Sequence, residues 1–168
     1  MIFYEQRSTI TMEEGYDVAQ ICYNGHVVNS SAKIYPQFNQ KFCATCGAET
    51  TTSCLECRAP IRGSYLDGLY AGYSAPSFCI YCGGAFPWTR ARVQAACELA
   101  RELDRLDDDD KVLLAKCIDD LITASPLAAV AATRFKKIMR KAGPDTELLF
   151  QELLTDLTPE PLRVTLWP

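Results

Sequence analysis

Seven of the nine cysteines in this chain, together with its only histidine, form four close pairs between residues 22 and 82. Thiolate and imidazole are the groups that zinc prefers, and a structural zinc ion takes four of them in a tetrahedron. Eight such donors match two closed sites, so the sequence predicts two structural zinc ions, Zn²⁺, as cofactors. The predicted ligands, in pairs along the chain, are Cys22 and His26, Cys43 and Cys46, Cys54 and Cys57, and Cys79 and Cys82.

These pairs can combine in two ways. Sequential pairing joins neighbouring pairs and leaves loops of 16 residues after His26 and 21 residues after Cys57, which suit hairpins that go out and return. A cross-brace, as in RING-type domains, joins the first pair to the third and the second to the fourth. That pattern usually keeps the second and third pairs adjacent, whereas seven residues separate them here. The spacing favours sequential pairing and leaves the cross-brace as the alternative.

A single histidine is more often a packed or surface residue than a ligand. Here the expectation reverses, because the first site has only three donors without His26. If His26 were not a ligand, an acidic residue such as Asp17, or water, would have to complete the site. Free or redox-active thiols are the remaining alternative, and eight matched donors disfavour it.

Composition narrows the setting of the protein. With 48% hydrophobic and 23% charged residues the chain is of ordinary globular composition, and it has no run of about 20 apolar residues. Paired Cys-x-x-Cys motifs indicate metal binding in a reducing compartment, so we expect the protein to stay in the cytoplasm. The formal charge of −4 becomes more negative once thiolates bind zinc. This disfavours attraction to nucleic acid or to an anionic membrane.

Short β-hairpins must position the ligands. The motif Phe42-Cys-x-x-Cys-Gly47 recurs as Phe78-Cys-x-x-Cys-Gly83, which indicates two copies of one ribbon design. Val27 and Val28 predict a strand whose returning arm is 33–42. The dipeptide Asp67-Gly68 predicts a second hairpin, between 61–65 and 69–73. The first residues, 1–12, are either a strand or a loose extension.

After Pro87 and Trp88 the apolar period changes from about 2 to about 3.6, which is typical of helices. We expect helices over about 90–105 and 109–123, a third from Pro126 to the residue before Gly143, and a fourth over about 146–157. The sequence thus predicts an α+β protein with tandem zinc ribbons followed by a small bundle of three to four helices. Its parts are an N-terminal extension (1–14), a double zinc-ribbon module (15–88), a helical bundle (89–158) and an extended C-terminal tail (159–168).

Several of these motifs together resemble a known family. The resemblance to an uncharacterised bacterial zinc-ribbon family, a domain of unknown function, covers roughly residues 15–142. It implies a zinc-ribbon fold with the eight ligands named above, and it implies no activity. The motifs are Tyr16-Asp-Val-Ala-Gln-Ile-Cys22-x-Asn-Gly-His26-Val-Val-Asn29, Tyr35-Pro-Gln-Phe-Asn39, Lys41-Phe-Cys-x-x-Cys-Gly-Ala48, Ala59-Pro-Ile-Arg-Gly63, Phe78-Cys-x-x-Cys-Gly83, Phe86-Pro-Trp-Thr89 and Arg134-Phe-Lys-Lys-Ile138.

Three other groups have simpler explanations than chemistry. Cys97 and Cys117 fall on apolar helix stripes, which indicates small buried side chains. The acidic run 107–110 suits the N-terminus of the second helix, where it caps the helix and interacts with its dipole. The basic cluster in the last turns of the third helix could grip phosphates, but cations are also expected there from the dipole. It consists of Arg134, Lys136, Lys137, Arg140 and Lys141.

We expect a protein that is not an enzyme. Catalytic zinc keeps an open position, the only histidine is committed to metal, and no hydrolase or phosphate-binding motif is present. The favoured hypothesis is an adaptor or scaffold that binds a protein partner or a second copy of itself, and no membrane. The alternatives are a nucleic-acid-binding regulator, which the charge disfavours, and a RING-like adaptor. Residues proposed for partner binding are Tyr65, Tyr70, Tyr73, Trp88, Arg134, Lys137 and Lys141.

Overall fold

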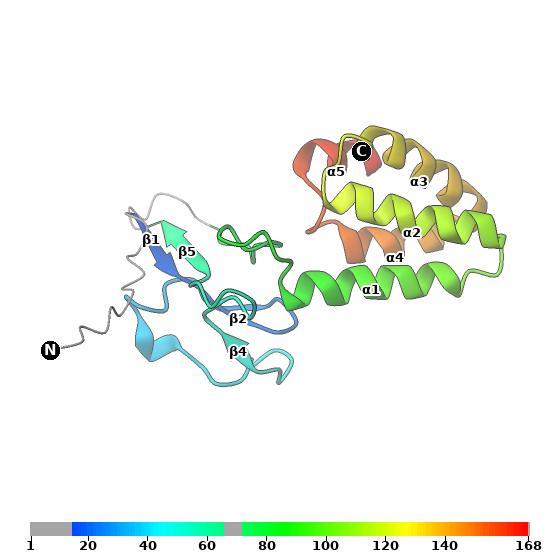
Figure 1. Ribbon diagram of the computed structural model, residues 1–168. Helices are drawn as coiled ribbons and strands as arrows, with labels where there is room; N and C mark the ends of the chain where they lie inside the picture. Colours follow the sequence, from blue (N-terminus) through cyan, green and yellow to red (C-terminus); the bar gives the residue numbers. More distant parts are fainter. Residues whose placement is uncertain (1–14, 66–71, 168) are drawn as a thin grey trace, which may run out of the picture. The chain divides into compact units, whose positions relative to one another are not determined.

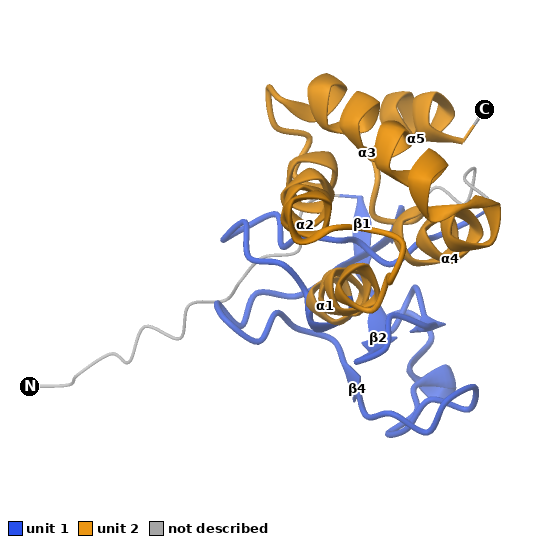
Figure 2. Ribbon diagram, turned by 90° about the vertical axis from the view of Figure 1, so that its right-hand side faces the viewer, with its two compact units in different colours: residues 1–88 blue, residues 89–168 orange. Residues whose placement is uncertain are grey.

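The computed structural model describes residues 15–65 and 72–167. The chain divides into two compact units, residues 1–88 and 89–168, which Figure 2 colours separately. The first unit carries short antiparallel strands in two small sheets, and five helices follow (Figure 1). The α+β class predicted from the sequence is therefore confirmed. None of the helices in these residues has the length and apolar character of a membrane-spanning segment.

Two small sheets form the frame of the first unit. Strand β1 (Tyr16–Val18) pairs antiparallel with β5 (Arg62–Tyr65). Strand β2 (Gln20–Cys22) lies between β3 (Val27–Asn29) and β4 (Thr50–Thr51), and both neighbours are antiparallel to it. The sheets therefore place two ligand pairs at strand ends and in the turns that follow.

The hairpins differ from those that the sequence predicted. Strand β3 returns directly onto β2, because Gly25 takes a φ of +89° and closes a tight turn. The segment 33–42 is not a returning arm; it is a loop that contains the 3₁₀ turn η1 (Pro36–Phe38). The turn at Asp67-Gly68 lies outside the described residues, and so do residues 1–14.

The apolar core of the first unit is small. It is formed by side chains in and next to the strands, by two of the predicted metal ligands and by the start of the first helix. The rings of Phe86 and Trp88 stack in it with centroids 4.7 Å apart. Its buried members are Ala19, Ile21, Cys54, Ile61, Cys79, Phe86 and Trp88. A core of this size contributes little stability by itself.

The second unit is all helical, and its helices are α1 (Pro87–Arg101), α2 (Asp108–Ile122), α3 (Ala128–Ala142), α4 (Pro144–Leu154) and α5 (Glu160–Leu166). Asp107 caps α2 as expected, since its carboxylate accepts a hydrogen bond from the Asp110 N–H at 2.8 Å. Helix α3 begins after a turn at 125–127, in which the Ser125 hydroxyl accepts a hydrogen bond from the Leu127 N–H. Phe135 and Phe150 meet edge to face at 5.7 Å in the core of this unit.

The expected extended tail at 159–168 is wrong, because residues 160–166 form the fifth helix, α5. Pro159 and Pro161 stand at and just after the start of this helix, where a missing N–H costs nothing. Leu166 is fully buried, and the ring of Trp167 meets Phe135 at 6.2 Å. Burial of this apolar end against α3 makes the short helix favourable.

Candidate metal centres

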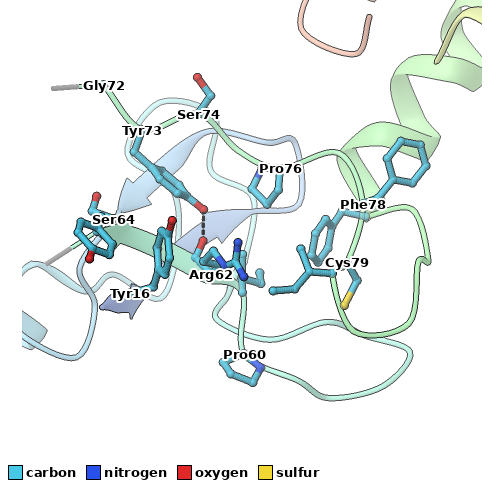
Figure 3. A pocket seen from close by; sticks show the side chains of 15 residues that line it. Tyr16, Pro60, Arg62, Ser64, Gly72, Tyr73, Ser74, Pro76, Phe78 and Cys79 are labelled. Atoms are coloured by element: carbon cyan, nitrogen blue, oxygen red, sulfur yellow. Dashed lines mark hydrogen bonds between the residues drawn. The ribbon is translucent and has the colours of Figure 1, made fainter. Parts of the chain in front are cut away.

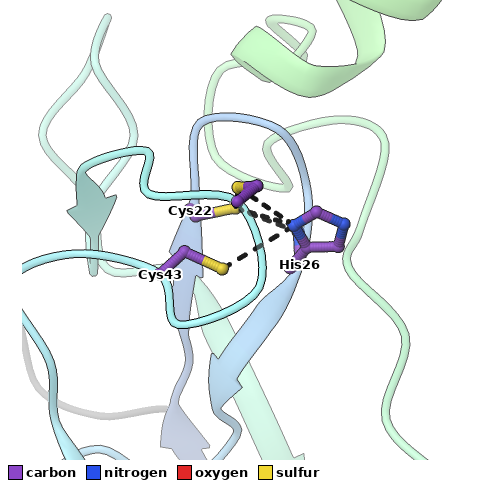
Figure 4. A group of neighbouring side chains, drawn as sticks. Cys22, His26 and Cys43 are labelled. Atoms are coloured by element: carbon purple, nitrogen blue, oxygen red, sulfur yellow. Dashed lines mark hydrogen bonds between the residues drawn. The ribbon is translucent and has the colours of Figure 1, made fainter.

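The first group of donors surrounds a single point between two turns (Figure 4). Cys22 ends β2, and the tight turn through Gly25 folds the His26 ring back toward it. Cys43 and Cys46 come from the Cys-x-x-Cys loop. The Nδ1 atom of His26 lies 3.3 Å from Cys46 Sγ, 3.5 Å from Cys22 Sγ and 3.7 Å from Cys43 Sγ. The sulfurs of Cys22 and Cys46 are 3.8 Å apart.

The second group contains four thiols in the same arrangement. Cys54 Sγ lies 3.8 Å from Cys82 Sγ, and Cys57 Sγ lies 3.7 Å from Cys79 Sγ. In each group the four donor atoms all lie within 4.8 Å of one another. The first ligand pair is therefore grouped with the second and the third with the fourth. This is the sequential order, and the cross-braced alternative is wrong.

The distances match a tetrahedron of the size that zinc requires. With zinc–sulfur bonds of about 2.3 Å and zinc–nitrogen bonds of about 2.0 Å, a tetrahedron places two sulfurs about 3.8 Å apart and a sulfur and a nitrogen about 3.5 Å apart. The observed separations scatter closely around both values. A disulfide would instead need sulfurs at about 2.05 Å. Both groups can thus hold a metal ion, and zinc fits the donor set.

Three Cys-x-x-Cys loops share one backbone conformation. In each, the N–H of the fourth residue after the first cysteine donates to the carbonyl of that cysteine, at 2.8–3.0 Å. That fourth residue has positive φ in all three loops: +72° at Gly47, +63° at Arg58 and +71° at Gly83. Glycine adopts this conformation without strain and arginine does not. The loop at 54–57 is therefore the exception among the three.

Backbone N–H groups in these loops point at sulfur and stabilise thiolate. Burial alone would raise the pKa of Cys43. Hydrogen bonds from the N–H groups of Thr45 and Cys46 lower it by more than burial raises it, so the pKa falls to about 6. The pKa of Cys54 falls to about 7, because N–H groups of its own loop outweigh its burial in the same way. One thiolate in each group is thus favoured without any metal.

The remaining thiols of each group hold their protons more tightly. The Gly84 N–H lowers the pKa of Cys82, yet desolvation and the three neighbouring thiols together raise it to about 12. Burial likewise raises the pKa of Cys22. Several thiolates cannot share so small a volume unless a cation balances their charge. The electrostatics of both groups therefore suit a divalent cation.

Two polar side chains next to the sulfurs were not among the predicted site residues. The Asn24 amide donates to Cys46 Sγ at 3.4 Å, and the Glu56 carboxylate lies 3.9 Å from Cys82 Sγ. A sequence signal existed for both, because each stands inside a chelating turn. Asp17, the substitute ligand considered for the first site, is not near it. Its buried carboxylate accepts hydrogen bonds from the N–H groups of Val18, Lys33 and Ile34.

The aromatic residues proposed for partner binding differ in their exposure. The prediction that Trp88 binds a partner at the surface is wrong, because Trp88 is 3% exposed and its Nε1–H donates to the Pro76 carbonyl at 2.8 Å. The Tyr73 hydroxyl donates to the Arg62 carbonyl at 2.5 Å, and burial raises the pKa of Tyr73 (Figure 3). Tyr65 is 41% exposed and, with Tyr73, lines a cavity of about 780 Å³ in the first unit. Tyr70 lies outside the described residues.

The basic cluster of α3 is partly engaged within its own unit. Lys141 Nζ forms an ion pair with Asp110 at 2.5 Å, and Lys136 Nζ donates to the Thr165 carbonyl at 2.7 Å. Arg134 and Lys137 are exposed. The cluster is therefore less available to phosphates than the sequence alone indicates. Of the two remaining cysteines, Cys117 is buried and Cys97 half-buried, and burial raises the pKa of both.

Comparison with known proteins gives one match. A family described as an uncharacterised protein conserved in bacteria, DUF2321, matches residues 15–166. The resemblance seen in the sequence motifs is confirmed, and it extends past residue 142 to the end of α5. No curated protein and no solved structure matches the chain.

Proposed function

The chain belongs to the DUF2321 family, and we propose that it is a zinc-dependent interaction module without catalysis of its own. In this proposal two structural zinc ions hold the first unit together, and the protein serves as an adaptor or scaffold for a protein partner. The compartment would be one in which thiols stay reduced, such as the cytoplasm.

The tetrahedral spacing of the two donor groups carries the metal part of the proposal. Each group supplies four protein ligands, whereas catalytic zinc sites supply three and leave a position for water. In a four-ligand site the protein fills every coordination position of the ion, and the bound ion holds the ligand loops in one conformation. Binding of a structural zinc ion contributes apparent free energies on the order of 10 kcal/mol, which a core as small as that of the first unit needs.

The proposed ligands of the two sites are Cys22, His26, Cys43 and Cys46, and Cys54, Cys57, Cys79 and Cys82. In both sites two cysteines are buried and the other two ligands are exposed. The ions would therefore lie between the core and the surface, where they fix the conformation of the exposed loops. A rigid surface of this kind costs little entropy when a partner binds.

Metal analysis of the purified, untagged full-length chain tests the first claim. We expect two equivalents of zinc, and one equivalent in each of the variants Cys46→Ser and Cys82→Ser. The control variant Cys117→Ser, which changes a buried cysteine outside both groups, should retain two equivalents of zinc. Fewer than two equivalents in the wild type would contradict the proposal, as would two-dimensional NMR signals of the first unit that survive a chelator unchanged.

Partner capture and solution mass test the second claim. We expect a discrete complex or a defined oligomer in size-exclusion chromatography with light scattering. A strict monomer that captures nothing would count against an adaptor. Catalytic turnover that is lost when either donor group is mutated would contradict the proposal and show that the protein is an enzyme.

A further inference from the structure

The loop at residues 33–42 exposes large apolar side chains on the first unit. Ile34, Tyr35, Phe38 and Phe42 are 49–60% exposed, and the other residues of the loop are exposed as well. The rings of Tyr35 and Phe38 lie together, with centroids 6.3 Å apart. The loop is the cyan segment with a single helical turn in Figure 1. A group of exposed apolar side chains marks an interaction site more often than single exposed apolar residues do.

Buried polar side chains hold this loop in place. The Asp17 carboxylate accepts the backbone N–H groups of Lys33 and Ile34 at 3.2 and 3.1 Å. The Asn29 amide donates to the Tyr35 carbonyl at 2.9 Å and to the Asn39 side chain at 2.8 Å. These contacts fix both ends of the turn that carries the aromatic rings.

A third buried side chain completes the support. The Gln20 amide accepts the Gln40 N–H at 2.9 Å and donates to the Gln40 carbonyl at 3.0 Å, so both backbone groups of that residue are bound. Asp17, Gln20 and Asn29 are each at most 9% exposed. Burying polar groups is favourable only when they are hydrogen-bonded, and each of these three side chains directs at least one of its hydrogen bonds to this exposed loop. The loop is therefore a preorganised surface, which lowers the entropic cost of binding.

The loop itself carries two charged side chains, and both are positive, while the carboxylate of Asp17 beneath it is buried and Glu49 lies opposite Phe42 in a β-bridge. From residue 30 to residue 48 the chain contains two lysines and no carboxylate, in a protein with a formal charge of −4. Lys33 and Lys41 stand at the two ends of the loop, and Lys41 Nζ lies 5.3 Å from the centroid of the Phe42 ring. An apolar surface with positive ends complements an apolar segment that carries carboxylates.

We propose that the loop 33–42 is the docking surface for an acidic, amphipathic segment of a partner protein. The apolar side chains of that segment contact Tyr35 and Phe38, and its carboxylates lie near Lys33 and Lys41. This inference rests on the proposed function and names the surface and the partner chemistry. Two lysines neutralise few phosphates, so the surface favours a protein over a nucleic acid.

A phage-displayed library of random 12-residue peptides, selected on the zinc-loaded full-length chain, tests the proposal. We expect enriched peptides that combine apolar residues with Asp or Glu. Labelled synthetic copies should bind at least about tenfold more weakly to Phe38→Ser, because a buried aromatic anchor dominates such contacts. The double variant Lys33→Glu, Lys41→Glu should also weaken binding, and raised salt should remove most of that difference. Leu148→Ser, at a 63% exposed leucine of α4, is the control and should bind as the wild type does.

Each other outcome overturns the proposal. These outcomes are a selection without enrichment, enriched peptides without an acidic preference, and binding that Phe38→Ser leaves intact. A 15-nucleotide oligouridine that binds more tightly than the peptides and depends on Phe38 would assign the loop to nucleic acid. Zinc content distinguishes failure of this docking surface from failure of the zinc-dependent module. If every variant keeps two equivalents of zinc and no peptide binds the loop, this surface is refuted while the zinc-held module stands.

Discussion

Arg58 occupies the position that glycine occupies in the other two Cys-x-x-Cys loops. We therefore expect the substitution Arg58→Gly to stabilise the loop at residues 54–57 and the zinc site that it forms. The φ of Arg58 is +63°, against +72° at Gly47 and +71° at Gly83. A Cβ built at either glycine meets no atom within 4 Å, so crowding adds nothing to the cost of a side chain there. The difference between glycine and any other residue at this position is therefore purely conformational.

Left-handed backbone costs a residue with a Cβ about 1–2 kcal/mol. Glycine recovers that cost but loses about 0.4–1 kcal/mol through the greater freedom of the unfolded chain. The net gain expected for Arg58→Gly is about 0.8 kcal/mol relative to Arg58→Ala, which also lacks the charge but keeps the strain. Because metal binding and folding are coupled in zinc modules, the gain corresponds to about fourfold tighter zinc binding at the second site.

Competition with a chromogenic chelator at fixed pH measures this ratio. Gly83→Ala acts on the same site through the equivalent position and should weaken zinc binding by a similar factor. The first site serves as the internal reference, because neither variant touches it. Zinc binding in Arg58→Gly that is equal to or weaker than in Arg58→Ala would refute the conformational argument and give the Arg58 backbone another role.

Three further predictions follow from single contacts. A Cβ on Gly63 would lie 2.3 Å from the Ser30 carbonyl oxygen, so Gly63→Ala should cost about 3 kcal/mol of unfolding free energy or more, measured by denaturant titration at fixed free zinc. Asp17→Asn cannot accept all three N–H bonds and should cost about 1.5–3 kcal/mol in the same assay; a loss below about 0.5 kcal/mol would contradict its role. Burial raises the pKa of Tyr73, so its contribution to stability is complete below about pH 10 and declines above it. Ultraviolet titration against Tyr73→Phe should reveal one phenol that ionises late; its absence would place Tyr73 in solvent.

The candidate metal centres could be predicted from the sequence because chelation is largely a local property. A Cys-x-x-Cys turn presents two sulfurs to one ion wherever the rest of the chain goes, and loop lengths between pairs limit how the pairs combine. The existence of the first four helices also followed from local periodicity. Their ends shifted by up to about four residues, since a start such as that of α1 at Pro87 depends on the packing of Trp88.

Long-range contacts decided the rest. Pairing of β1 with β5 joins residues more than 40 positions apart, and no short pattern specifies it. The sequence predicts the segment 33–42 as the returning arm of a hairpin, but Asp17 and Asn29 bind its backbone groups and hold it as a loop with one turn. Local sequence does not distinguish Trp88 from an exposed aromatic residue, because its burial depends on core residues far away in the chain, such as Ile21. In the structure its ring stacks on Phe86 and packs in the core of the first unit.

Helix α1 starts within the first unit: its residues Pro87 and Trp88 belong to that unit, and the Trp88 ring shares a core with the ligands Cys54 and Cys79. A tryptophan in that position gives the protein a built-in optical probe of its metal state. Its emission should be blue-shifted while the second site is filled and move to longer wavelength as a chelator strips the ion. Trp167, which contacts Phe135 in the helical unit, supplies a constant background in the same spectrum.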